Sequence, residues 1–213
     1  MRMLLVLLIA LSALPATAKE VPDRYGDFMG VLNQVHGLNS ELLSRDSATA
    51  TLQNWCDAHG PGGGVRIMAR RISGADKPAG RAERRDLKVG RKAVVAYRRV
   101  ELVCGDKVLS EADNWYLPGR LTPEMNAALT GTQTPFGVVV KQLNFRRRTL
   151  SSEPLPGWMA QVGRGSSAAP TRPGFLVLPH EILRHRAVLT TPDGVPFSLV
   201  VESYTDALIV SPP

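Results

Sequence analysis

The stretch AVVAYRRVELVCGDKVLSEADNWYL, residues 93–117, carries the clearest structural signal in the chain. Apolar and polar side chains alternate along 93–104, and residues 107–117 return as a second extended segment, a pattern typical of β-strands. Gly105 and Asp106, between the two segments, favour a tight turn. The stretch therefore predicts an antiparallel hairpin.

Further segments share the strand pattern. They are 65–70, 144–152, 184–191 and 195–205, and a Pro-Asp-Gly turn separates the last two. The final two segments therefore predict a second hairpin. Together the segments indicate an antiparallel sheet.

Helices are predicted before and between these strands. Residues 27–43 carry apolar side chains at steps of three and four, and a second helix begins at Asp46 or Ser47. A threonine–proline pair opens each of two short helices, at 122–129 and 134–143. This order predicts a single α+β domain whose antiparallel sheet carries its helices on one face.

Three segments lie outside this pattern of strong helices and strands. Residues 73–92 are charged and predict a surface loop or a short helix. Residues 153–174 are rich in Pro, Gly and Ser and predict a flexible loop. Residues 179–183 predict at most one helical turn.

The first 18 residues resemble a secretory signal peptide. Arg2 is followed by an apolar run from Leu4 to Leu14 and by the small residues at 16–18. The run is about half the ~20 residues that a membrane-spanning helix needs. We therefore expect residues 19–213 to form an exported domain, periplasmic or secreted. A retained N-terminal anchor is the alternative.

The chain is basic, with a formal net charge of +7. Excess positive charge attracts nucleic acid, anionic lipid or small anions. The arginines are dispersed and no aromatic residues interleave with them, so nucleic-acid binding is not expected. We expect a small-molecule ligand and a monomer.

Two cysteines remain, Cys56 and Cys104. In an oxidising compartment they can form one disulfide, or they can be two buried thiols, and the sequence leaves both open. No His/Cys cluster has the spacing of metal ligands, so no metal is expected. The four histidines lie near no nucleophile motif and are assigned no role.

Arg99 and Glu202 are charged residues within otherwise apolar predicted strands. Arg99 shares a strand face with Glu101, and Glu202 shares one with Tyr204. If helices cover that face, burial raises the pKa of the carboxyl group, and the guanidinium can hold an anionic substrate. The alternative is a solvent-exposed ion pair without function.

Several segments together resemble the bacterial chorismate pyruvate-lyases and their relatives. In order they are LLSRDSATATL (42–52), RRVELVCGD (98–106), NWYLPGRLTP (114–123), TPFG (134–137), and HRAVL with DGVPFSLVVESY (185–204). The resemblance spans most of residues 42–205. The same fold also serves as the effector-binding domain of certain transcription regulators.

The resemblance implies a six-stranded antiparallel sheet that encloses an aromatic ligand under flaps. Family members split chorismate into 4-hydroxybenzoate and pyruvate without metal or cofactor. The family's carboxylate-binding arginine falls on Arg99, and its carboxylate that meets the hydroxyl or ether oxygen falls on Glu202. A ligand-binding backbone amide falls on Phe136, and the flap falls on Ala48.

The chain departs from the family at these positions. Familiar lyases carry Met in place of Ala48 and Leu in place of Phe136, so the pocket walls differ. The chain is also one residue longer between the last turn and Glu202. That insertion places the carboxylate on the wrong face of the sheet unless a β-bulge absorbs it.

Two functions from different classes follow. The first is an exported lyase, free of cofactors, that acts on chorismate or a related enolpyruvyl compound. The alternative is a non-catalytic periplasmic module that binds an aromatic carboxylic acid. A third reading is a structural or interaction protein whose pocket is filled by side chains.

Overall fold

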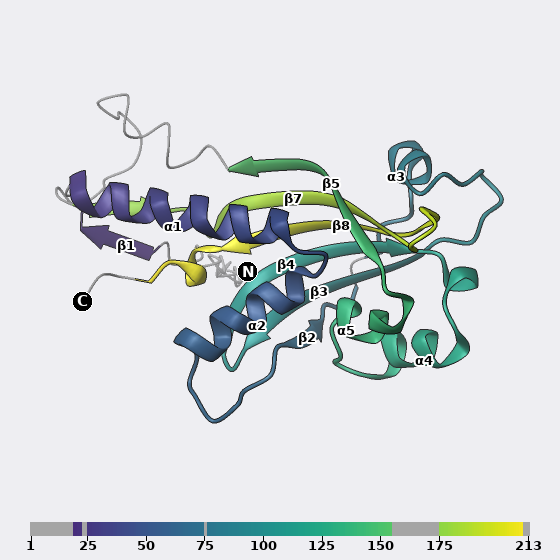
Figure 1. Ribbon diagram of the computed structural model, residues 1–213, viewed down its shortest axis with the longest axis horizontal. Coiled ribbons are helices and arrows are strands. Elements are labelled where there is room, and N and C mark those ends of the chain that lie inside the picture. The colour runs from purple at the N-terminus through teal and green to yellow at the C-terminus, as the bar shows by residue number, and fades with distance from the viewer. Residues whose placement is uncertain (1–18, 23–24, 75, 155–174, 211–213) are drawn as a thin grey trace, which may run out of the picture.

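The computed structural model describes residues 19–22, 25–74, 76–154 and 175–210. The expected signal peptide at 1–18 and most of the expected loop at 153–174 lie outside the described residues. Within them, no helix combines the length and the apolar character needed to cross a membrane. Figure 1 shows one large sheet with helices packed against it.

The large sheet has six antiparallel strands in the order β2-β3-β4-β8-β7-β5. Their bounds are β2 (Met68–Arg71), β3 (Ala96–Cys104), β4 (Lys107–Tyr116), β5 (Arg146–Pro154), β7 (Glu181–Thr190) and β8 (Pro196–Thr205). The two predicted hairpins, β3–β4 and β7–β8, meet in the middle of the sheet. The predicted α+β class with about six antiparallel strands is confirmed.

The helices lie mainly on one side of this sheet (Figure 1). On this side lie α1 (Tyr25–Ser44), α2 (Ala48–His59), α4 (Pro123–Gly131) and the four-residue α5 (Phe136–Val139), and single turns occur at Pro118–Arg120, Lys141–Leu143 and Asp206–Leu208. Ser47 caps α2, because its hydroxyl accepts a hydrogen bond from the Ala50 amide at 3.3 Å. Thr122 caps α4 in the same way.

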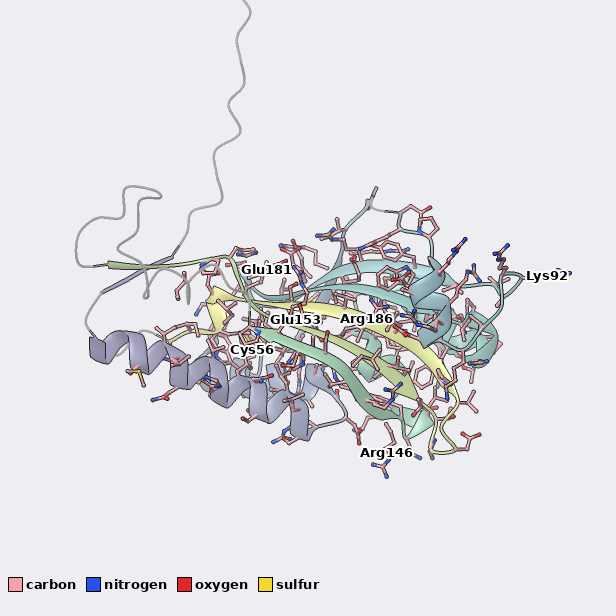
Figure 2. All side chains as sticks on the ribbon, turned by 90° about the horizontal axis from the view of Figure 1, so that it is seen from above. Cys56, Lys92, Arg146, Glu153, Glu181 and Arg186 are labelled. Carbon is pink, nitrogen blue, oxygen red and sulfur yellow. A yellow bond between two sulfur atoms is a disulfide. The ribbon has the colours of Figure 1, made fainter. Side chains whose placement is uncertain are left out.

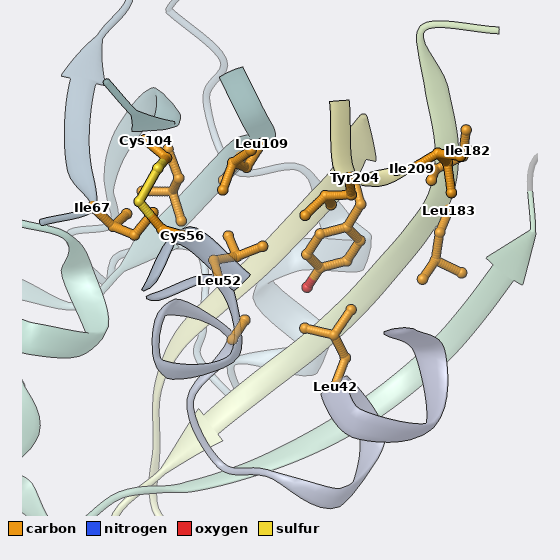
Figure 3. Packing of buried hydrophobic residues seen from close by; sticks show 14 of the residues in the cluster. Leu42, Leu52, Cys56, Ile67, Cys104, Leu109, Ile182, Leu183, Tyr204 and Ile209 are labelled. Carbon is orange, nitrogen blue, oxygen red and sulfur yellow. A yellow bond between two sulfur atoms is a disulfide. The ribbon is translucent and has the colours of Figure 1, made fainter. Parts of the chain in front are cut away.

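The main core lies between α1, α2 and the sheet. Leu42 of α1 and Leu52 of α2 pack with Leu183 of β7 and Tyr204 of β8, and all four are fully buried (Figure 3). Burying one such leucine stabilises the fold by roughly 2 kcal/mol. The stripe at 27–43 therefore marks the helix face that covers the sheet.

One short helix lies on the opposite face of the sheet. The segment after α3 (Arg81–Asp86) buries Leu87 against Trp115 and Leu199. Arg186 of β7 donates to Asp86 at 2.8 Å, and Figure 2 shows it on the side away from α1. The prediction of helices on one face therefore holds for the long helices and not for α3.

The prediction of a helical turn at 179–183 is wrong. Glu181 already pairs with Thr205 of β8 and begins β7. Ile182 and Leu183 are both fully buried, so this segment extends the sheet ladder instead of forming a surface turn. Before it, β6 (Phe175–Leu178) pairs with β1 (Lys19–Pro22) in a separate two-stranded sheet that the sequence did not predict.

Cys56 of α2 and Cys104 at the end of β3 form a disulfide with a Cα–Cα distance of 5.8 Å (Figure 3). The cross-link ties α2 to the sheet. Gly60 lies directly beside it, and a Cβ atom at this position would be only 2.7 Å from the Cys104 sulfur. A residue larger than glycine therefore does not fit without displacing the disulfide.

Removing the disulfide in a Cys56→Ala, Cys104→Ala double variant is expected to lower the free energy of unfolding. The cysteines are 48 residues apart, and closing a loop of this length is worth about 4 kcal/mol. Urea unfolding of the oxidised protein and of the double variant measures the difference. Reductant should destabilise the wild type and leave the double variant unchanged. Equal stability of the two proteins without reductant would contradict the expectation.

Candidate functional site

A buried cavity lies between the helices and the sheet. Its floor includes Ala112 of β4 and Val200 of β8, and its cover includes Ala48 of α2 with Phe136 and Phe145. The cavity has a volume of about 50 Å³. A single water molecule needs roughly 10–15 Å³, so the cavity holds several waters or a small organic molecule.

Cross-strand pairing determines which side chains reach the cavity. Val100 of β3 pairs with Ala112, and Ala112 pairs with Glu202 of β8, so these three side chains lie on one face. Because successive strand residues alternate between faces, Arg98 points to the face of Val100 and Arg99 to the opposite face. Arg98 and Glu202 both line the cavity.

The structure does not place Arg99 in the cavity with Glu202, as the resemblance implied, and Arg99 forms an ion pair on the other face of the sheet, close to the alternative of a solvent-exposed pair. Arg99 donates to Glu111 Oε2 at 3.0 Å, and its side chain is 39% exposed. It lines a separate, charged depression on the other side of the sheet. Arg98 occupies the position expected of Arg99. Arg98 lies two residues before Val100, and strand residues two apart share a face, so this spacing was the signal in the sequence.

A β-bulge places Glu202 on the buried face. Leu189 of β7 pairs with Ser198, whereas Thr190 pairs with Pro196, so Phe197 of β8 is an extra residue in the ladder. The bulge absorbs the additional residue that the sequence has between the turn and Glu202. Ala48 and Phe136, the other two predicted site residues, also line the cavity.

Arg98 has no carboxylate partner among the described residues. Its side chain is buried, with the residue 2% exposed, and Nη2 donates to the Thr134 carbonyl at 3.3 Å. The buried Nε and Nη1 have no hydrogen-bond partner. Burial, and secondarily the charge of Arg71, lowers the pKa of the Arg98 guanidinium. An unpaired buried charge costs several kcal/mol, so this group attracts an anion.

Arg147 of β5 is a second buried guanidinium at the cavity. Its Nη1 lies 3.7 Å from Glu202 Oε2, and both side chains are only 4% exposed. Nε and Nη2 of Arg147 are buried without a hydrogen-bond partner in the described part of the chain. Arg147 is the middle one of three consecutive arginines, 146–148, and such a run does not show which member faces inward.

Glu202 has both carboxylate oxygens occupied by hydroxyl donors. Ser110 Oγ donates to Oε1 at 2.9 Å, and Tyr204 Oη donates to Oε2 at 3.0 Å. Burial, and then the negative charge of Glu202, raises the pKa of the Tyr204 phenol. The tyrosine therefore keeps its proton and remains a donor to the carboxylate.

His185 of β7 lies behind this pair and was assigned no role from the sequence. It is fully buried, and its Nε2 lies 2.8 Å from Asn39 Oδ1, which also accepts a hydrogen bond from Ser152. Burial, and then the charge of Arg147, lowers the pKa of His185 to about 4. The ring is therefore neutral at pH 7, with Nε2 as the donor to Asn39.

A larger cleft adjoins the cavity. It measures about 670 Å³ and shares Ser47, Thr49, Gly137 and Phe145 with the cavity lining. A Cβ atom on Gly137 would lie 3.3 Å from Ser47 Oγ and 3.4 Å from Thr49 Oγ1. Glycine at this position therefore avoids close contacts with two hydroxyl groups where the linings of the cleft and the cavity meet.

The cavity lining offers guanidinium, carboxylate and amide groups to a ligand. Within the described ranges, no group of three or more His, Cys, Asp or Glu side chains is placed to hold a metal ion. The expectation that the chain needs no metal or cofactor remains a prediction.

The chain is similar to a curated bacterial protein and to solved effector domains. It is 47% identical over 182 residues to the uncharacterized protein y4mC of Sinorhizobium fredii, covering 82% of this chain and 75% of that protein. No family model matches.

Among solved structures, the effector domain of PhnF from Mycobacterium smegmatis matches with a TM-score of 0.50 and 13% identity, covering 78% of this chain and 93% of that domain. YydK from Bacillus subtilis matches with a TM-score of 0.43 and 13% identity, covering 70% of this chain and 62% of YydK. The chain thus spans less than two thirds of YydK. The PhnF match shows the fold alone: the chorismate lyase-like fold of GntR-family effector domains.

The buried histidine makes stability depend on pH. In the unfolded chain His185 takes up a proton near its ordinary pKa of 6.5, and in the folded chain only near 4. The contribution of His185 to the free energy of unfolding is therefore complete above pH 6.5 and is lost as the pH falls towards 4. Between pH 7 and pH 4, the wild type should lose on the order of 3 kcal/mol more stability than a His185→Gln variant.

Urea unfolding of both chains at several pH values measures this difference. Glutamine keeps a donor for Asn39 but does not titrate, so its curve isolates the histidine from the carboxyl groups. Parallel curves for the two chains would show that His185 does not titrate as expected.

Proposed function

The chain belongs to the same family as y4mC of Sinorhizobium fredii and has the chorismate lyase-like fold, and we propose that its buried cavity binds a small aromatic carboxylic acid. The observation that carries this proposal is Arg98, a buried guanidinium that faces the cavity without a carboxylate partner among the described residues. A ligand carboxylate would supply the missing negative charge and accept the open N–H groups.

The walls of the cavity favour a flat ring. Phe136 and Phe145 cover it, and both rings pack on Phe197 with centroids 6.4 and 6.3 Å away. The floor of Ala112 and Val200 is apolar. Apolar walls with a few fixed polar groups are typical of small-molecule sites, and aromatic walls gain from contact with an aromatic ligand.

Binding without chemistry is the function that the site supports best. Glu202 accepts a hydrogen bond from a hydroxyl group at each of its oxygens. These two contacts hold the carboxylate as a fixed hydrogen-bond acceptor, which suits the binding of a ligand. This arrangement favours the binding module over the lyase.

Replacing Arg98 by methionine should abolish binding of 4-hydroxybenzoate, whereas Arg99→Met should leave it unchanged. Loss of a buried charged contact costs about 2–4 kcal/mol, or roughly 30- to 1,000-fold in Kd. Isothermal titration calorimetry of the two variants and the wild type measures this. The free energy of unfolding of Arg98→Met should equal or exceed that of the wild type, because the variant removes an unpaired buried charge.

The two arginines are a matched pair, adjacent in β3 and on opposite faces of the sheet. Equal binding by all three chains would exclude the cavity as the site. Loss of binding in Arg99→Met alone would place the ligand on the other face.

A lyase acting on chorismate is the second candidate, and the position of Glu202 at the cavity favours it. Here Glu202 would act as a carboxylic acid that protonates the ether oxygen while the bond between the ring and that oxygen breaks, and the ring would lose a proton as it becomes aromatic. The same protein is incubated with chorismate and assayed for 4-hydroxybenzoate and pyruvate. Product that disappears in Glu202→Gln would establish the lyase; the proposed binding function predicts no product.

We also propose that the chain is exported and that residues 1–18 are removed. The leader-like sequence supports this, as does the disulfide, because disulfides persist in oxidising compartments. Expression of the full chain in a bacterium, followed by fractionation and N-terminal sequencing, tests the proposal. We expect periplasmic protein that begins at Lys19; full-length protein in the cytoplasm would contradict it.

A further inference from the structure

The cavity has a second arginine that the proposed function does not use. Arg98 comes from β3 and Arg147 from β5, and the strands β4, β8 and β7 separate them in the sheet. At about 4.8 Å per strand, the two backbones are up to roughly 19 Å apart. The long side chains therefore approach the cavity from opposite sides, and the floor of Ala112 and Val200 lies between them.

Arg147 presents an open pair of donors. Nε and Nη2, its two unpartnered nitrogens, carry the parallel N–H groups of the guanidinium side. The side chain is only 4% exposed, so bulk water does not satisfy them. Unmade hydrogen bonds of a buried charged group are costly, which indicates that a ligand atom accepts them.

The charges of the lining allow one negative charge on the ligand. Arg98 and Arg147 contribute two positive charges and Glu202 one negative charge. The remaining charged residue of the lining, Asp46, accepts hydrogen bonds from Arg146 Nη1 at 3.1 Å and from the Arg147 amide at 2.8 Å, so Arg146 balances it. One carboxylate at Arg98 makes the cavity neutral, and a second would leave it negative.

Glu202 already accepts a hydrogen bond at each of its oxygens. Ser110 and Tyr204 are the donors, and the carboxylate lies 3.7 Å from Arg147. A donor on the ligand would have to share an oxygen with one of these hydroxyls. An acceptor on the ligand meets the open N–H groups of Arg147 without displacing anything.

From this geometry we propose that Arg147 is a specificity-determining residue that recognises an uncharged oxygen acceptor at the end of the ligand opposite its carboxylate. The inference rests on the proposed function, with the carboxylate at Arg98. It adds the ligand class: a monoanionic aromatic acid with a carbonyl or comparable acceptor oxygen at the far end.

A pair of ligands of equal shape tests the proposal. In 4-acetylbenzoate a carbonyl oxygen replaces one methyl group of 4-isopropylbenzoate. Wild-type protein should bind the acetyl compound at least about 10-fold more tightly, because a hydrogen bond to a charged donor is made with one ligand and lost with the other. Terephthalate, which adds a second charge, should bind more weakly than 4-acetylbenzoate.

Two variants assign the preference to Arg147. Arg147→Met removes the donors, and Arg147→Lys keeps the charge beside Glu202 but loses the parallel N–H pair. Both should reduce the acetyl preference to near 1 while still binding 4-isopropylbenzoate. Arg148→Met, an exposed neighbour in β5, is the matched control and should retain the preference. The lysine variant keeps the test valid if the methionine variant unfolds.

The outcomes separate this inference from the proposed function. The benzoates can bind and need Arg98 without any preference for 4-acetylbenzoate over 4-isopropylbenzoate, or with a preference that survives in Arg147→Lys. Either outcome shows that the role proposed for Arg147 is wrong. Tighter binding of terephthalate would show that Arg147 takes an anion instead. If no benzoate binds, the proposed function fails and this inference fails with it.

Discussion

The central pairing of β4 with β8 is the constraint on which the site depends. It joins the two hairpins into one sheet and sets Ala112 opposite Glu202. Because side chains alternate along a strand, this one register assigns every residue of both hairpins to the helix side or to the other face. A shift by one residue would move Arg98 out of the cavity and Arg99 into it.

The electrostatics of the cavity explain why these residues suit a binding site. A core built for stability alone would not retain a buried guanidinium without a counter-charge, because desolvation costs several kcal/mol. Arg98 is such a group, and Arg147, although Glu202 lies 3.7 Å from it, keeps two buried nitrogens without a hydrogen-bond partner in the described part of the chain. This desolvation free energy destabilises the protein without ligand, and an anionic ligand offsets it. Stability and affinity are therefore coupled through the same charge.

The surrounding structure holds this arrangement rigidly. The disulfide attaches α2, which contributes Ala48 to the cover of the cavity, to the end of the strand that carries Arg98. On the other side, Asn39 of α1 contacts His185 and Ser152, so the long helix is connected by hydrogen bonds to the strands behind Glu202. Pre-positioned groups lose little entropy when the ligand binds.

The sequence by itself determined the two hairpins, the amphipathic helices and the antiparallel α+β class, because periods of 2 and 3.6 are local properties of the chain. The resemblance to the chorismate pyruvate-lyases also indicated Glu202, Ala48 and Phe136 as cavity residues. Only the tertiary structure decided that Arg98, and not Arg99, faces the cavity, that Phe197 forms the bulge, and that Arg147 and His185 are buried. These depend on which face the helices cover and on how strands distant in sequence align, and no local pattern contains that information.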